Sequence, residues 1–301
     1  MQKTLISIIG STGIGKTKLA IEMAKHFGTE IISCDSRQFF KEMKIGTATP
    51  TDEELAQAKH HFIGHLSVQD YYSIGQYEED ALEKIEEIFE KNDFAVLVGG
   101  SMMYEKAVVE GLNDLPEANA ENQEKLQKIL DEEGLEKLQE ILKNLDEEYY
   151  NVVHKENPRR LLRAIDVIWQ TGRKYSEIIA EPKHKRDFKV IRIGVTAPRE
   201  IMYERINLRV DKMLEKGLID EVKSLTKYQN LVPLQTVGYT EIFKYLEGTW
   251  DLDFAVEEIK KNSRRYAKRQ ETWNRKVENV TWLPYDYSEE QLDEILSKIE
   301  K

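Results

Sequence analysis

The sequence of 301 residues contains one cysteine, Cys34. A single cysteine cannot form an intrachain disulfide, which is typical of a protein from a reducing compartment, so we expect a cytoplasmic protein. The sequence also lacks any run of about 18 consecutive apolar residues, which predicts no transmembrane helix. The apolar run near the N-terminus is short and leads directly into a glycine-rich loop. We therefore interpret it as a first strand and not as a signal peptide.

A net positive charge is also lacking, because 44 Lys and Arg face 55 Asp and Glu, for a net charge of -11. This sum argues against a nucleic-acid partner, since contacts to phosphates need positive potential. The acidic residues are, however, concentrated in 78–90, 117–148 and 288–300. Basic residues are concentrated elsewhere, and the local pattern decides whether a basic surface exists.

Apolar runs rich in Ile and Val alternate with helical patterns along most of the chain. Nearly continuous apolar runs are typical of strands covered on both faces, so the alternation predicts a parallel α/β sheet flanked by helices. The predicted strands are 4–10, 30–35, 60–66, 94–100, 189–197 and 280–283. The predicted helices are 16–27, 74–91, 102–111, 199–228, 235–247 and 252–276.

This alternation stops between about 114 and 185, where no strand pattern occurs. Helical patterns at 121–131, 134–150 and 157–171 carry an apolar stripe of Leu and Ile, which predicts an inserted helical subdomain. The chain is thus expected to consist of an α/β core, 1–113 with 186–301, and an insert, 114–185. No coiled-coil pattern is present, and we expect a monomer.

The strongest local motif follows the first predicted strand and matches G-x-x-x-x-G-K-[ST]. Such a loop aims backbone N–H groups and a helix N-terminus at an anion, which predicts a P-loop NTPase-like core that binds a di- or triphosphate. In this motif the lysine contacts the terminal phosphates and the hydroxyl residue offers a ligand to Mg²⁺. The motif consists of Gly10, Ser11, Thr12, Gly13, Ile14, Gly15, Lys16 and Thr17.

The motif does not define the chemistry that follows. A kinase or ATPase usually carries an acid at the end of another apolar strand, where it helps to hold magnesium. The strand 94–100 ends instead in Gly99-Gly100-Ser101, whereas the strand 30–35 ends in Asp35. The acid expected near the phosphates is therefore Asp35, which is followed by Ser36, Arg37 and Gln38.

Further blocks of sequence stand out beyond the phosphate loop. They are Asp35-Ser36-Arg37-Gln38 with Ile45-Gly46-Thr47-Ala48, His60-His61, Leu97-Val98-Gly99-Gly100-Ser101 with Tyr104, Arg159-Arg160-Leu161-Leu162-Arg163-Ala164, Arg205-Ile206-Asn207 with Arg209-Val210-Asp211, Val237-Gly238-Tyr239 with Glu241, and Arg265-Tyr266-Ala267-Lys268-Arg269-Gln270 with Thr272-Trp273. In this order, over nearly the whole chain, they resemble the bacterial tRNA dimethylallyltransferases (the IPP transferase family). The chain departs from the family at Gly13-Ile14, where Ala-Ser is usual, and at Ser101-Met102-Met103, where Thr-Gly-Leu is usual. These departures concern substrate preference more than the reaction class.

The resemblance implies transfer of a dimethylallyl group from its diphosphate to N6 of adenosine 37 in tRNA. The phosphate loop would then hold a diphosphate leaving group, stabilised by Lys16, the loop amides and Mg²⁺ near Thr17. Arg205 and Arg209, four residues apart on one helix face, are expected to contact the same phosphates. The alternative for each arginine is a solvated helix residue.

Asp35 is expected to act as the general base on the attacking amine, with a role as a magnesium ligand as the alternative. By the resemblance, Ser36, Arg37 and Gln38 line the adenine pocket and Ser101 lies on its tRNA side. An adenine stacked in the anticodon loop has to flip out to reach such a site, which implies a tunnel open at both ends.

Two basic clusters are candidate contacts to the tRNA anticodon stem-loop. The alternative for either is an ordinary solvated helix face, but two clusters in an acidic protein favour an RNA-binding surface. On the first helix, Tyr266, Gln270 and Trp273 share another face and are expected to pack. The clusters are Arg264, Arg265, Lys268 and Arg269 within the basic helix 260–276, and Arg159, Arg160 and Arg163 in the insert.

Two other functions remain open from the residues. A small-molecule or nucleotide kinase would bind ATP in the phosphate loop and would not need the basic helix. A non-catalytic RNA-binding module would tolerate Asp35→Ala. Cys34 is expected to be a buried small apolar residue, and His60 and His61, adjacent on a predicted strand, point to opposite faces and favour structural roles.

Overall fold

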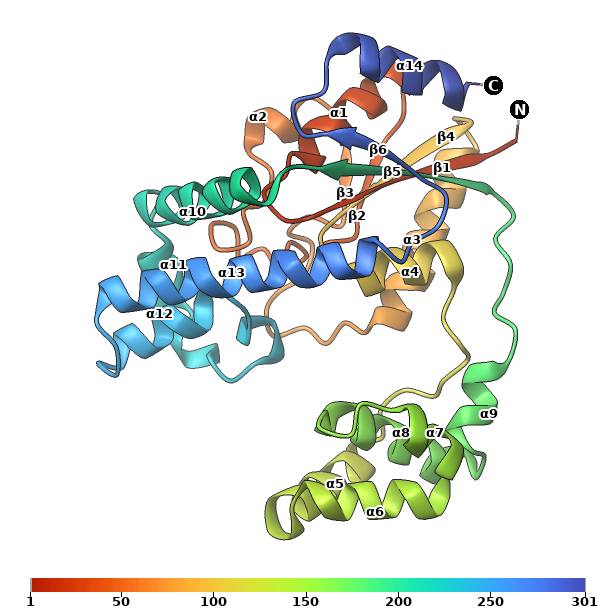
Figure 1. The fold of residues 1–301 in the computed structure, drawn as a ribbon, viewed down its shortest axis with the longest axis vertical. Helices are drawn as coiled ribbons and strands as arrows, with labels where there is room; N and C mark the ends of the chain where they lie inside the picture. Colours follow the sequence, from red (N-terminus) through yellow and green to blue (C-terminus); the bar gives the residue numbers. More distant parts are fainter. Residues whose placement is uncertain (1, 301) are drawn as a thin grey trace. The chain divides into compact units, whose positions relative to one another are not determined.

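The computed structural model describes residues 2–300 and contains one six-stranded sheet (Figure 1). Every strand pair is parallel, and the strand order is β3-β2-β4-β1-β5-β6. This arrangement confirms the predicted α/β class. The strands are β1 Thr4–Gly10, β2 Ile31–Ser33, β3 His60–His61, β4 Phe94–Val98, β5 Lys189–Thr196 and β6 Val280–Pro284.

The centre of the sheet is apolar on both faces. All seven residues of β1 are buried, and neighbouring side chains point to opposite faces, so that Leu5 belongs to one core cluster and Ile6 to the other. Helices α3 (Ile74–Phe89) and α4 (Met102–Glu110) contribute to the cluster around Leu5, and α1 (Lys16–Phe27) and α14 (Glu289–Ile299) to the cluster around Ile6 (Figure 1). Two-sided burial explains why these strands read as continuous apolar runs.

Several predicted boundaries were wrong. The strand 60–66 is limited to His60–His61, because Phe62 adopts a left-handed conformation with φ 62° that an extended strand cannot continue. The helix 199–228 is split into α10 (Arg199–Glu215) and α11 (Leu218–Ser224), since Gly217 between them has φ 95°.

Two helices were not predicted from the sequence, Asp52–Leu55 and α14. None of the helices within residues 2–300 combines the length and the apolar character needed to cross a membrane. Short 3₁₀ turns at Thr226–Tyr228 and Val232–Leu234 connect α11 to α12. The helices not yet given are α2 Asp52–Leu55, α12 Tyr239–Leu246 and α13 Leu252–Asn274.

The chain divides into two compact units, Met1–Val109 with Arg186–Lys301, and Glu110–Lys185. The second unit is helical and has a core of its own, which includes Leu126, Leu142 and Ile165. The single helix expected over 134–150 is two helices, because Asp146 ends α6 and accepts a hydrogen bond from the Tyr149 amide as the N-cap of α7. Its helices are α5 Ala120–Glu133, α6 Leu135–Leu145, α7 Glu147–Val152, α8 Pro158–Thr171 and α9 Tyr175–Ala180.

The buried carboxylate of Asp166 links the start of α5 to α8 within this second unit. It accepts hydrogen bonds from the side chains of Asn122 (3.0 Å), Gln170 (3.0 Å) and Arg163 (3.3 Å). Replacing it by alanine leaves these donors without their acceptor. We expect Asp166→Ala to lower the free energy of unfolding by about 2–4 kcal/mol, measured by urea denaturation followed by circular dichroism. Asp131→Ala, at an exposed position of α5, is the matched control, and an equal loss in both variants would contradict this assignment.

Candidate active site

The phosphate loop connects β1 to α1, as its motif predicted. Gly15 is the N-cap of α1 and provides no side-chain hydrogen bond, so the first amides of the helix keep their N–H groups available. Free amides at a helix N-terminus attract an anion. The loop therefore has the construction of a phosphate-binding site.

Lys16 lies buried at the start of this helix. Its Nζ donates a hydrogen bond to the carbonyl oxygen of Ser11 at 2.8 Å, within the loop itself. Burial lowers the pKa of Lys16 to about 8, an effect that the nearby Asp35 carboxylate partly opposes. A phosphate bound beside this buried ammonium would stabilise its charged form and raise its pKa again.

Two arginines of α10 reach the phosphate loop. Arg209 is half-buried and donates through Nη1 to Thr12 Oγ1 and through Nη2 to the carbonyl of Thr47, both at 3.1 Å. Arg205 is more exposed and donates through Nε to the carbonyl of Gly13 at 2.9 Å. Both guanidinium groups thus lie against the loop, as expected from their spacing on one helix face.

Asp35 follows β2, and its surroundings are fixed by the end of β4. A side chain on Gly99 would lie 2.5 Å from the Cys34 carbonyl carbon, and one on Gly100 would lie 3.0 Å from the Asp35 carboxylate. Only glycines permit this close approach of the two strand ends. The backbone amide of Arg37 donates to Asp35 Oδ1 at 3.1 Å and orients the carboxylate.

The residues after Asp35 make two separate sets of hydrogen bonds. The hydroxyl of Ser101 accepts a hydrogen bond from the Ser36 amide at 3.0 Å and lies 2.8 Å from the Ser36 hydroxyl, so the two serines form one polar cluster. Gln38 instead donates to the carbonyls of Thr47 and Ala48. The side-chain amide of Gln38 therefore helps to fix the loop that contains Thr47 and Ala48.

Helix α13 contributes buried polar groups that the sequence analysis had expected only to pack. Gln270 accepts a hydrogen bond from the Thr12 amide of the phosphate loop at 2.8 Å and donates to the Gly100 carbonyl at 2.7 Å. Tyr266 donates to the same carbonyl at 2.9 Å. The packing of both side chains is confirmed, but a helical pattern alone does not reveal which backbone groups they meet.

Two cavities meet at this point of the molecule. The first, about 490 Å³, includes the phosphate loop, Lys16 and Thr17, and the second, about 240 Å³, includes Ser36 and Ser101. Four residues line both: Thr12, Asp35, Arg209 and Tyr266. The site therefore has one compartment at the phosphate loop and a second compartment, with the Asp35 carboxylate at their junction.

The basic residues predicted to contact RNA are not equally available. In the first unit Arg265, Lys268 and Arg269 are exposed, whereas Arg264 donates to Asn207 of α10 at 2.6 Å. In the second unit Arg159 and Arg160 are exposed. Arg163 there donates to the Pro116 carbonyl and pairs with Asp166, so its guanidinium is engaged within the unit.

Among residues 2–300 no group of three or more His, Cys, Asp or Glu side chains is arranged to hold a metal ion. His61 pairs with Glu30, and His60 bonds to the Ala58 carbonyl, which agrees with structural roles. Thr17 and Asp35 both line the phosphate compartment. Mg²⁺ usually takes only one or two protein ligands and completes its shell with phosphate oxygens and water, so this pair fits a magnesium ion brought by a diphosphate.

A phosphate loop that follows a central strand of a parallel sheet defines the class of P-loop-like α/β proteins. In this chain an acid, Asp35, also lies where the two compartments of the site meet. The IPP transferase sequence model matches residues 38–277. The chain is 50% identical over 300 residues to the tRNA dimethylallyltransferase of Christiangramia forsetii, covering 99% of each.

Solved structures agree with this relationship. The full-length tRNA isopentenylpyrophosphate transferase of Bacillus halodurans is 35% identical, with a TM-score of 0.73 and coverage of 99% of this chain and 96% of that one. A eukaryotic dimethylallyltransferase acting on tRNA is 26% identical, with a TM-score of 0.84 and coverage of 99% and 77%. This chain belongs to the IPP transferase family, which confirms the resemblance found in its sequence.

The lowered pKa of Lys16 predicts a pH-dependent anion affinity. As the pH rises through about 8, the ligand-free protein loses the Lys16 charge, so inorganic diphosphate should bind more weakly. We expect a loss of about tenfold between pH 7 and pH 9, measured by isothermal titration calorimetry. Diphosphate itself titrates, so the comparison is with Lys16→Arg, whose side chain stays charged. The same pH profile in both proteins would refute the role of Lys16 titration.

Proposed function

We propose that this chain transfers the dimethylallyl group of dimethylallyl diphosphate to N6 of adenosine 37 in tRNA, with release of diphosphate. The observation that carries the proposal is the position of Asp35 at the junction of the phosphate-loop compartment and a second compartment. A transfer between two substrates needs the donor and the acceptor to meet, and Asp35 lies where the two compartments meet. The family of the chain favours this function over a kinase or a non-catalytic RNA-binding module.

In the proposed reaction the N6 amine attacks the allylic carbon, and the bond from that carbon to the diphosphate oxygen breaks. The electron pair of the broken bond stays on the diphosphate. Lys16, Arg209 and the free amides at the start of α1 are in position to stabilise this growing negative charge. Arg205, which contacts the loop from outside, adds a further positive charge.

Asp35 is proposed to accept the proton that the N6 amine loses as the new carbon–nitrogen bond forms. An amine conjugated to an adenine ring is a weak nucleophile, so removal of this proton assists the attack. Magnesium ligation is the alternative role of the same carboxylate. When bound, Mg²⁺ neutralises charge on the diphosphate, and the Thr17 hydroxyl with Asp35 is the pair that would hold it.

The acceptor is proposed to be the anticodon stem-loop, with the target adenine flipped into the compartment that Ser36, Arg37 and Ser101 line. Exposed Arg265, Lys268 and Arg269 on α13 supply contacts to the RNA backbone in this proposal, as does the inserted subdomain (residues 114–185) through Arg159 and Arg160. The internal contacts of Arg264 and Arg163 make these two arginines weaker contributors. One chain supplies all of these residues, so we propose that a monomer is active.

The transferase activity is tested with magnesium, dimethylallyl diphosphate and an anticodon stem-loop RNA that carries an adenosine 3′ to the anticodon. We expect the RNA to gain the mass of one dimethylallyl group, detected by mass spectrometry. Asp35→Asn should lower the rate by about 10²–10⁴-fold if Asp35 is the base. Asp70→Asn in a loop is the matched control and should react at the native rate.

Three outcomes would change this proposal. A native rate for Asp35→Asn removes Asp35 from the role of the base and keeps the transferase. If added Mg²⁺ restores the rate of Asp35→Asn, the magnesium-ligand role of Asp35 is favoured instead. No mass gain with any loop sequence, together with turnover of ATP, would replace the transferase by a kinase.

A further inference from the structure

The loop of residues 43–49 lies between the two compartments of the site. Gly46 and Thr47 line the compartment proposed for the acceptor, and Ala48 lines the phosphate compartment. Ala48 adopts a left-handed conformation with φ 46°, which is unfavourable for a residue with a side chain. Such a conformation persists only where surrounding contacts hold it.

Besides the bonds from Gln38 to the Thr47 and Ala48 carbonyls, contacts that hold the loop come from Glu221 on α11. Its Oε2 accepts a hydrogen bond from the Ile45 amide at 2.7 Å, and its Oε1 accepts one from the Gly46 amide at 2.9 Å. Hydrogen bonds from backbone amides to a carboxylate are stronger than bonds between neutral groups. Glu221 thus fixes two consecutive peptide groups from behind the loop.

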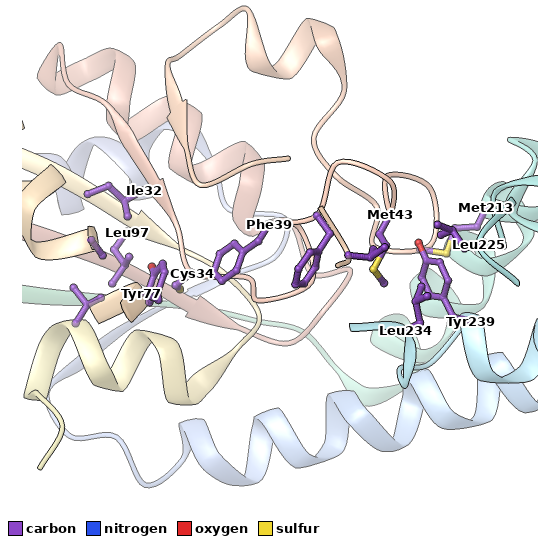
Figure 2. Close-up of a cluster of buried hydrophobic side chains, with 14 of the residues drawn as sticks. Ile32, Cys34, Phe39, Met43, Tyr77, Leu97, Met213, Leu225, Leu234 and Tyr239 are labelled. Atoms are coloured by element: carbon purple, nitrogen blue, oxygen red, sulfur yellow. The ribbon is translucent and has the colours of Figure 1, made fainter. Parts of the chain in front are cut away.

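Tyr239 completes this arrangement from the start of α12. Its hydroxyl donates to Glu221 Oε1 at 2.6 Å, and its ring packs so closely under the loop that a side chain on Gly46 would lie 2.5 Å from it. Figure 2 shows Tyr239 beside Met43, in the same buried cluster as Leu225 and Leu234. Burial, together with the Glu221 carboxylate, raises the pKa of Tyr239 well above its usual value, so the hydroxyl keeps its proton and stays a donor.

The fixed loop in turn holds Arg209. The carbonyl of Thr47, the residue after Gly46, accepts from Arg209 Nη2, while Arg209 Nη1 reaches Thr12 of the phosphate loop. A continuous series of contacts therefore runs from Glu221 through the loop backbone to a guanidinium at the diphosphate site. Glu221 itself lines neither compartment, so it acts on the site through the loop backbone and through Arg209.

We propose that Glu221 is a positioning residue of the prenyl transfer, which acts by fixing the Ile45–Thr47 backbone so that Arg209 points at the diphosphate. This inference rests on the proposed function. It predicts that the Glu221 side chain affects the chemical step and the affinity for diphosphate, with little effect on RNA binding. A purely structural role would lower stability and leave both quantities unchanged in the folded protein.

The test is a double-mutant cycle between Glu221→Gln and Arg209→Ala, with kcat measured at saturating RNA and dimethylallyl diphosphate. Glutamine keeps one acceptor oxygen but turns an NH₂ group toward a backbone N–H, so the loop loses a contact. In the native background we expect Glu221→Gln to lower kcat about 10- to 100-fold, with the KM for RNA changed less than about twofold. Asp220→Asn removes the same charge from the neighbouring exposed position and should leave kcat unchanged.

In the Arg209→Ala background, Glu221→Gln should lower kcat less than about threefold, because the group it positions is absent. Equal effects in both backgrounds, or a native kcat for folded Glu221→Gln, would overturn the proposal. Tyr239→Phe, which removes one donor to Glu221 and keeps the ring, provides a milder variant if Glu221→Gln fails to fold, and is expected to lower kcat in the same direction.

A second readout separates this proposal from the proposed function. Binding of inorganic diphosphate, measured by calorimetry, needs no transfer reaction, and we expect Glu221→Gln to weaken it by about tenfold relative to Asp220→Asn. Native diphosphate affinity in Glu221→Gln would refute the positioning role. An unmodified protein that binds diphosphate but transfers nothing to RNA would refute the proposed function alone.

Discussion

The bridge that Gln270 makes between the phosphate loop and the end of β4 determines the geometry of the whole site. Its amide oxygen accepts from the Thr12 N–H, and its amide nitrogen donates to the Gly100 carbonyl. Gly100 in turn lies against the Asp35 carboxylate. The buried side chain of Gln270 therefore fixes the separation between the phosphate loop and Asp35. Loss of the bridge would leave the Thr12 N–H without this acceptor, whereas the Gly100 carbonyl would keep its hydrogen bond from Tyr266.

Helix α13, which carries Gln270, also carries exposed basic residues. The face of α13 that carries Gln270 is buried, while Arg265, Lys268 and Arg269 on other faces are exposed. A rigid helix thus carries both the bridge inside the site and the basic groups proposed for RNA, which links the position of the acceptor to that of the phosphate loop. On the other side of the site, Glu221 fixes the loop that orients Arg209. Both arrangements use side chains that bind backbone groups, and such contacts set distances without entering the chemistry.

Local features of the sequence predicted much of this structure. Buried strands read as continuous apolar runs, and the phosphate loop is a contiguous motif, so both were found without knowledge of tertiary contacts. The short strand at His60–His61 and the break at Gly217 depend on single left-handed residues that periodicity does not detect. The roles of Gln270 and Glu221 depend on bonds to residues more than a hundred positions away, and a helical pattern shows only which face is buried. For the same reason the internal contacts of Arg163 and Arg264 were not foreseen, since charge clusters look alike whether they face solvent or a neighbouring helix.

The most direct test of this account is the rate of a single turnover by Gln270→Leu, measured with RNA and dimethylallyl diphosphate bound in advance. Leucine fills a similar volume but can neither accept from Thr12 nor donate to Gly100. If the bridge sets the separation between the leaving group and Asp35, the rate of prenyl transfer falls by more than about tenfold in folded protein that still binds both substrates. A native rate of transfer in that folded variant would contradict the account.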